Sequence, residues 1–148
     1  MMPPPFRFSL QRILDLRKQQ EEQAQAELAR AQSEHMVQQH HLERLRRDLD
    51  EIALQAGSSR AFDSAELWLW LRYRERILQD IEATAARVEE LARKVERCRA
   101  EVVERSKERQ KLEKLRAQRA MRYYEEQKAR EQKELDEMAG LYHQKGPL

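Results

Sequence analysis

Apolar residues in the first half of the chain recur at alternating intervals of four and three residues, the spacing of a coiled-coil helix. The series begins at Leu10 and ends at Ala56, and ten of its fourteen positions are apolar. Its four polar positions are Arg17, Glu21, His35 and Gln38. We expect looser packing at these positions. The pattern predicts a helix over about residues 10–56, with Ser9 as its N-cap.

The same alternation returns in the second half of the chain. It runs through Leu67, Leu71, Arg74, Leu78, Ile81, Ala85 and Val88. Beyond this point two registers remain open, Leu91/Val95/Cys98/Val102 or Ala92/Val95/Arg99/Val102. The apolar pattern fades after Val103. It predicts a second helix over about residues 64–140, ended by Gly140.

A short turn-forming run, residues 57–63, separates the two series. Gly57 suits the position after a helix, where a left-handed backbone costs glycine little. Asp63 is a candidate N-cap for the second helix, and Glu66 three residues later completes a capping box. Phe62 and Leu67 have the spacing of a hydrophobic staple. The run therefore predicts that the chain turns back on itself here.

These elements predict an all-α fold: a single domain over residues 1–148 that forms a long antiparallel two-helix coiled coil, or helical hairpin. A symmetric turn would place Leu28 near residues 88–92 and Leu49 near Leu71. It would place Leu10 opposite about residue 110. Residues 111–140 then have no partner helix and form an overhanging C-terminal helix.

Composition supports solvated helices over a compact core. Of the 148 residues, 38% are charged, 6% are aromatic and only 3 are Gly. The net charge of +2 predicts no nucleic-acid binding, although residues 105–122 carry a local net charge of +6 from eight basic and two acidic side chains. The sequence shows neither a signal peptide nor a membrane span, so we expect a cytoplasmic protein.

Catalytic and metal-binding chemistry is not expected. The sequence contains no phosphate-binding glycine loop, nucleophile elbow or paired cysteines. His35 and His41 are six residues apart and lie on different faces of a helix, which does not favour a metal site. The lone Cys98 is interpreted as a small residue of the helix interface. We therefore expect no catalytic residue, no cofactor and no metal.

Aromatic residues crowd the start of the second helix. Trp68 and Trp70 lie about 200° apart around a helix, so both cannot face one partner helix. With Phe62 and Tyr73 they form either a local hydrophobic plug or a docking surface. We expect at least one of the two tryptophans to be exposed.

Three stretches resemble the flagellar FliJ family, the coiled-coil component of the flagellar type III export ATPase complex. The first is residues 6–17, which read FRFSLQRILDLR. The second is Lys111-Leu112-Glu113-Lys114-Leu115, followed by residues 131–137, which read EQKELDE. The third is Trp70-Leu71-Arg72-Tyr73, after the turn. Together they span nearly the whole chain.

The resemblance implies a non-enzymatic stalk that inserts into the export ATPase ring, touches the cytoplasmic domain of the export gate and escorts export chaperones. It implies a cytoplasmic protein held at the inner membrane through its partners. We expect the ATPase contact at Lys111, Leu112, Lys114, Leu115, Arg116, Arg119, Arg122, Leu135 and Met138. We expect the gate contact at Leu45, Leu49, Trp70, Tyr73 and Ile77. A stalk of a virulence secretion system and a general structural coiled coil are the alternatives.

Overall fold

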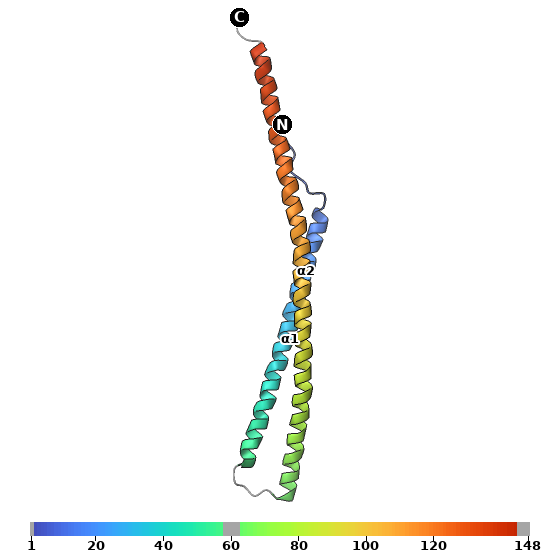
Figure 1. Cartoon of the computed structure of the whole chain (residues 1–148), viewed down its shortest axis with the longest axis vertical. Helices are drawn as coiled ribbons and strands as arrows, with labels where there is room; N and C mark the ends of the chain where they lie inside the picture. The colour runs from blue at the N-terminus through green and yellow to red at the C-terminus, as the bar shows by residue number, and fades with distance from the viewer. Residues whose placement is uncertain (1, 58–62, 145–148) are drawn as a thin grey trace. The chain divides into compact units, whose positions relative to one another are not determined.

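The computed structural model describes residues 2–57 and 63–144, and these fold into two long helices (Figure 1). Helix α1 covers Gln11–Gly57, 47 residues, and helix α2 covers Ser64–Gln144, 81 residues. The described residues contain no strand. Their contacts divide the chain into a turn-proximal unit, Glu22–Val103, and a terminal unit, Met1–Glu21 with Glu104–Leu148. Within each unit, α1 and α2 pack against each other in antiparallel directions.

The start of α2 is capped as expected. Asp63 Oδ1 accepts a hydrogen bond from the Glu66 backbone N–H at 2.7 Å, and the Asp63 carbonyl accepts one from the Leu67 N–H at 3.0 Å. An aspartate in this position satisfies a backbone donor that has no partner within the helix. The N-cap prediction for Asp63 is therefore confirmed. The predicted staple depends on Phe62, which lies outside the described residues.

The first helix ends at the predicted glycine but without the predicted left-handed cap, and the helix end predicted at Gly140 is wrong. Gly57 is the last residue of α1 itself, and no described glycine has a positive φ, so no left-handed cap is formed there. Gly140 lies inside α2, which continues to Gln144. One glycine costs a helix only about 1 kcal/mol relative to alanine. The good helix formers on both sides of Gly140 outweigh that cost.

The predicted stripe of α1 is confirmed over its whole length. All fourteen of its positions are buried or half-buried. In the turn-proximal unit the most buried of them are Ala24, Ala31, Leu42 and Ile52. Ala31 is 0% exposed, and the small side chain at this position allows the two helix backbones to come close. The heptad spacing of α1 therefore identified the face that packs on α2.

The stripe of α2 takes a different face from the predicted one at its start. Its buried positions in the turn-proximal unit are Ile77, Thr84, Leu91 and Val95, with Ile81, Val88, Cys98 and Val102 half-buried between them. Of the two registers left open beyond Val88, the structure takes the one through Leu91 and Cys98. Leu67, Leu71 and Leu78 are exposed, so the predicted start of the stripe is wrong. The first turns of α2 are apolar on every side, and spacing alone cannot select a face there.

The predicted register is wrong by about one heptad. In the turn-proximal unit, Lys94 Nζ lies 3.5 Å from Glu34 Oε2. This ion pair places Leu28 opposite about residue 100 and Leu49 opposite about residue 79. In the terminal unit, Arg116 Nε donates to Gln11 Oε1 at 3.1 Å, which places Leu10 near residue 117. A heptad pattern fits a partner equally well after a slip of seven residues, so the pattern does not specify the register.

Candidate partner-binding surfaces

A charged cluster occupies the helix interface of the terminal unit. Its members are Arg17, Gln20, Glu21, Arg105, Glu108, Arg109 and Glu113. Arg109 bonds the Glu21 carboxylate through Nε, and its Nη2 lies 3.4 Å from Glu21 Oε1. Its Nη1 also donates to Glu113 Oε2 at 2.7 Å. The Glu21 side chain is only 12% exposed, so loss of Arg109 would leave a nearly buried carboxylate without its main partner.

The other half of the cluster shares acceptors between two guanidinium groups. Arg17 Nη1 lies 3.2 Å from Glu108 Oε2 and donates to Gln20 Oε1 at 3.1 Å. Arg105 Nη1 lies 3.5 Å from the same carboxylate oxygen and 3.4 Å from the same amide oxygen. Glu108 Oε2 is therefore held by two ion pairs, although neither has the alignment of a hydrogen bond. In place of the looser packing expected at Arg17 and Glu21, this part of the interface is closed by ion pairs.

The cluster is electrically balanced. The side-chain hydrogen bond with Glu21 raises the pKa of Arg109, while desolvation acts in the opposite direction. An arginine is already charged throughout the physiological pH range, so the higher pKa produces no pH switch. Three guanidinium groups face three carboxylates. The cluster therefore holds the two helices together and offers little free charge to a ligand.

An extended N-terminal strap, Pro3–Ser9, precedes α1 and packs along α2 (Figure 1). Phe8 is 7% exposed, and the Arg119 guanidinium lies over its ring at 5.6 Å. Arg119 Nη1 also donates to Ser9 Oγ at 3.0 Å. Further along α2, Tyr123 bonds the Pro4 carbonyl through its hydroxyl and packs its ring 5.7 Å from that of Phe6. The strap therefore continues the pairing with α2 beyond the first residue of α1.

The strap changes the predicted overhang. We expected residues 111–140 to have no partner in this chain, and this is wrong for their first part. Arg116 bonds Gln11, and Arg119 and Tyr123 contact the strap. The described side chains of residues 132–144, in contrast, are all exposed. Helix α2 extends beyond the strap. In the described part of the terminal unit, only the last turns of α2 are therefore not packed against another segment.

The exposed end of α2 carries an ordered apolar face, which we call the C-terminal stripe. It runs at alternating intervals of three and four residues through Met121, Tyr124, Lys128, Glu131, Leu135, Met138 and Tyr142. All seven side chains are exposed, with Leu135 at 60%, Met138 at 67% and Tyr142 at 82%. This spacing is the one that lets a helix pack against another helix. The stripe is therefore a candidate docking surface.

A second apolar surface lies at the start of α2. Leu67, Trp68, Leu69, Leu71 and Tyr73 are all exposed, and Trp68 is 58% exposed. The Arg72 guanidinium lies over the Trp68 ring at 5.2 Å. Trp70 is half-buried, and its Nε1 is buried without a hydrogen-bond acceptor among the described residues. The expectation that at least one of these two tryptophans is exposed is confirmed by Trp68.

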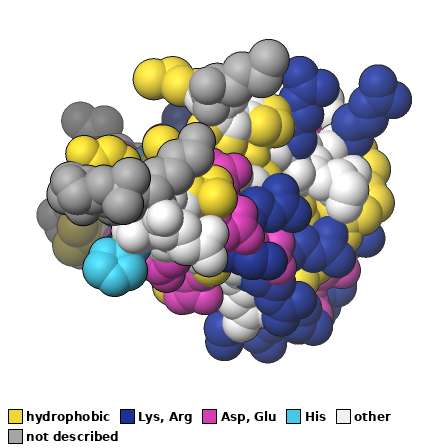
Figure 2. Space-filling model, turned by 90° about the horizontal axis from the view of Figure 1, so that it is seen from above, with side chains coloured by type: hydrophobic (Ala, Val, Ile, Leu, Met, Phe, Trp, Pro, Cys, Tyr) yellow, Lys and Arg dark blue, Asp and Glu magenta, His cyan; other side chains and the backbone are white. Residues whose placement is uncertain are grey.

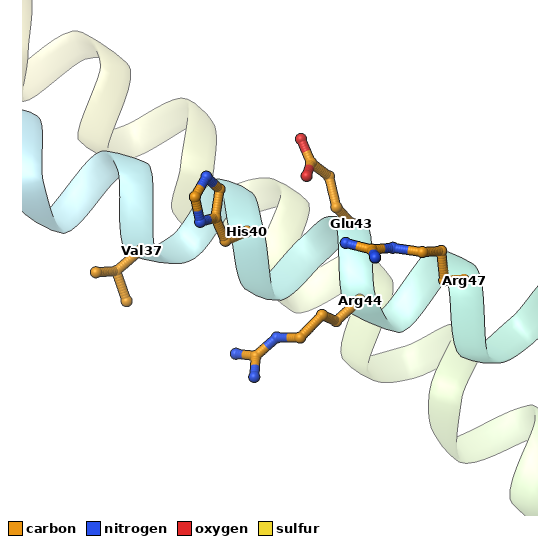
Figure 3. A pocket seen from close by; sticks show the side chains of 5 residues that line it. All are labelled: Val37, His40, Glu43, Arg44 and Arg47. Atoms are coloured by element: carbon orange, nitrogen blue, oxygen red, sulfur yellow. The ribbon is translucent and has the colours of Figure 1, made fainter.

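Several hollows along the described helices are open to solvent. One lies on α1 and is lined by Val37, His40, Glu43, Arg44 and Arg47. Figure 3 shows these side chains pointing in different directions, with Glu43 directed away from Val37 and Arg44. No group of three or more His, Cys, Asp or Glu side chains in residues 2–57 and 63–144 is arranged to hold a metal ion. Over the same residues, neither helix is long and apolar enough to cross a membrane.

Charge at the surface is mixed. Figure 2 shows Lys and Arg side chains interleaved with Asp and Glu side chains, and hydrophobic side chains that reach the surface between them. Among the basic residues of α2, Lys111, Lys114 and Arg122 are exposed and form no ion pair with another described residue. Arg116 and Arg119, by contrast, bond Gln11 and the strap. The accessible positive charge is therefore smaller than the local sequence charge indicates.

Comparison with protein families identifies the chain. The model of the flagellar FliJ protein family matches residues 6–147, nearly its whole length. The chain belongs to the flagellar FliJ protein family. No curated protein and no solved structure matched it. The family is a non-catalytic component of flagellar export, which makes this chain a flagellar export-associated protein with a place in flagellum assembly, protein transport and motility.

In this FliJ-family chain the predicted ATPase-contact residues fall into four groups. Leu112 and Leu115 are half-buried, and Arg116 and Arg119 bond the N-terminal segment. Lys111, Lys114 and Arg122 are exposed without a described ion pair, and Leu135 and Met138 are exposed on the C-terminal stripe. The C-terminal stripe itself was not recognised from the sequence. Its signal was the three-and-four spacing that begins again at Met121 on a new face of the helix.

The predicted gate-contact residues also differ from one another in solvent exposure. Tyr73 is exposed, while Leu45, Leu49 and Trp70 are half-buried. Ile77 is 4% exposed and packs inside the helix interface. Ile77 therefore offers no surface to a partner in this structure. The accessible part of the region consists instead of Leu67, Trp68, Leu69, Leu71 and Tyr73.

Proposed function

We propose that this protein is a non-enzymatic coiled-coil stalk of the flagellar type III export apparatus. It binds the export ATPase ring through the C-terminal part of α2, and the cytoplasmic domain of the export gate through the start of α2. It assists export chaperones at the same apparatus. It acts in the cytoplasm, at the inner membrane, and its association with the membrane is through these partners.

The observation that carries the ATPase contact is the exposure of Leu135 and Met138 at the end of α2. Exposed apolar residues at helical spacing favour a docked partner, because their burial is worth about 25 cal/mol per Å² of apolar surface. No strap covers these positions in the described part of the chain. A ring whose pore presents apolar side chains among acidic ones would provide the matching surface.

Positive charge on the same helix supports the same proposal. Lys111, Lys114 and Arg122 are exposed and not neutralised by a described ion pair. Charges of this kind raise the rate of encounter with an acidic partner, after which apolar contacts hold the docked complex. The attraction is screened over about 8 Å at physiological ionic strength. Binding to an acidic pore of the ring is therefore expected to weaken as salt increases.

The ATPase contact is tested by reversing only the unpaired charges. Lys111→Glu, Lys114→Glu and Arg122→Glu together are expected to reduce stimulation of the export ATPase, most strongly at low salt. Arg116 and Arg119 stay unchanged, because their reversal would also disturb their contacts with Gln11 of α1 and Ser9 of the strap. A matched control reverses Arg30, Arg93 and Arg97, which are exposed and lie in the turn-proximal unit. Full stimulation by the first variant at every salt concentration would falsify the stalk proposal.

The gate contact is proposed for the apolar surface at the start of α2. Trp68→Ala and Tyr73→Ala remove exposed rings and are expected to weaken binding to the cytoplasmic domain of the gate, with helicity and ATPase stimulation retained. Trp70→Ala serves as the comparison, because its half-buried ring also contributes to the fold. A pulldown and circular dichroism measure the two properties. Unchanged gate binding by the Trp68 and Tyr73 variants would remove this surface from the proposal.

A further inference from the structure

The C-terminal stripe has the composition of one half of a two-helix interface. Met121 and Tyr124 lie at one end, and Leu135, Met138 and Tyr142 at the other, all exposed. Between them the stripe is interrupted by one basic and one acidic residue, Lys128 and Glu131. Neither forms an ion pair with another described residue of this chain. Two opposite charges side by side in an apolar stripe indicate a partner that presents the same two charges in reverse order.

We propose that this partner is the same stripe of a second copy of the chain, packed in the antiparallel direction. The twofold axis then passes between Lys128 and Glu131. Lys128 faces Glu131 of the second copy, and Glu131 faces Lys128 of the second copy. A twofold interface of this kind uses one surface twice, so it requires a stripe that is complementary to itself. The order of charges in the C-terminal stripe meets that requirement.

The apolar layers fit the same axis. Tyr124 faces Leu135 of the second copy, and Met121 faces its Met138. In each layer an a position of one helix thus faces a d position of the other, as antiparallel pairing of two helices requires. Beyond them, Ala117 faces the large Tyr142 of the second copy. No apolar residue of the stripe is left opposite a charge.

Flanking residues add no repulsion to the antiparallel arrangement. Glu125 faces Gln132 of the second copy, and Gln127 faces its Glu134, so each carboxylate meets an amide. A parallel arrangement instead places Lys128 opposite Lys128 and Glu131 opposite Glu131. Like charges opposite each other at these positions oppose pairing. The charge pattern therefore selects the antiparallel direction.

The strap leaves room for this second helix. It contacts α2 through Arg119 and Tyr123, which are not stripe residues. Pro3–Pro5 line a hollow together with Tyr124, Lys128 and Glu131 of the stripe. They therefore border the surface without covering it, since all three stripe residues remain exposed. The overlap of residues 117–142 with their copies is about 39 Å long at 1.5 Å per residue.

Self-pairing would cover Leu135 and Met138, which also belong to the proposed ATPase contact. The two associations therefore exclude each other, and self-pairing provides a state in which the apolar end of α2 is not exposed to solvent. The inference does not depend on the ATPase. It is tested with the purified full-length chain alone, so its failure leaves the proposed function untouched.

The charge pairs give a decisive test by sedimentation velocity. Lys128→Glu and Glu131→Lys each replace two attractions with two repulsions in the dimer, and each is expected to weaken self-association about tenfold. An equimolar mixture of the two variants restores opposite charges in both pairs and is expected to associate like the original chain. Lys133→Glu, exposed and outside the stripe, is the control. A chain that is monomeric at every concentration, or association unaffected by the single variants, overturns the proposal.

The direction of pairing is tested by cysteine substitution in a Cys98→Ser background. Chains with Tyr124→Cys alone, or with Leu135→Cys alone, are not expected to form disulfide dimers, because identical positions lie about 16 Å apart along the antiparallel pair. A mixture of the two is expected to form the mixed disulfide. Efficient dimers of each single variant with itself would show a parallel pair and overturn the antiparallel arrangement.

Discussion

Arg109 and Glu21 form an ion pair between α1 and α2 at positions where the heptad stripes of both helices call for apolar side chains. In α1, Glu21 follows Arg17 in the stripe. In α2, the series that starts at Ile77 reaches Arg105 and Arg109 at the same alternating intervals. The interface of the terminal unit therefore contains a charged layer where an ordinary coiled coil has leucines.

Removing one member of this pair is expected to destabilise the protein, while removing both is not. Arg109→Leu leaves the Glu21 carboxylate, 12% exposed, without its main partner, and the melting temperature should fall. Arg109→Leu with Glu21→Leu replaces the pair by two apolar side chains, and the melting temperature should return to the original value or exceed it. Circular dichroism during heating measures both.

Lys111→Leu is the control for this pair, because it removes a charge from an exposed site of the same helix. A double variant no more stable than Arg109→Leu would mean that the ion pair stabilises the folded protein more than apolar packing does at this point of the interface.

The register of the turn-proximal unit is testable by disulfide formation in a Cys98→Ser background. The Glu34–Lys94 ion pair places Ala31 beside Val95, so Ala31→Cys with Val95→Cys should crosslink within one chain. Leu28→Cys with Leu91→Cys reproduces the symmetric register and should not crosslink. Gel mobility without and with a reductant separates the products. Crosslinks that form only between chains would instead show a dimer of extended chains.

The strap should depend on Phe8, whose ring is buried beneath the Arg119 guanidinium. Phe8→Ala is expected to destabilise the docked strap by about 3 kcal/mol, the usual cost of deleting a buried aromatic ring. Amide hydrogen exchange at Gln11, whose N–H donates to the Phe8 carbonyl at 3.1 Å, should become faster. Ile13→Ala, at a more exposed position, is the control. Equal protection of Gln11 in the Phe8 variant and the original chain would show that the strap is held by its other contacts.

Local sequence determined the two helices, the break between them and the face of α1 that packs on α2. Each depends on residues close together in the chain. The Asp63 cap satisfies a backbone donor three residues away, and the α1 stripe repeats over fourteen positions with few ambiguities. Helix formation and capping depend on residues a few positions apart, so the order of residues along the chain is enough to predict them.

Tertiary structure decided the face of α2, the register and the contacts of the basic residues in 105–122. The apolar run Leu67-Trp68-Leu69-Trp70-Leu71 suits several faces of a helix, and the position of α1 selects the one that contains Trp70 and Ile77. A slip of seven residues leaves every heptad position unchanged, whereas only contacts such as Glu34 with Lys94 distinguish the registers. Arg119 looked like a free surface charge until the strap placed Phe8 and Ser9 against it. These features depend on residues that are distant in the sequence, and short-range periodicity carries no information about which distant side chains meet.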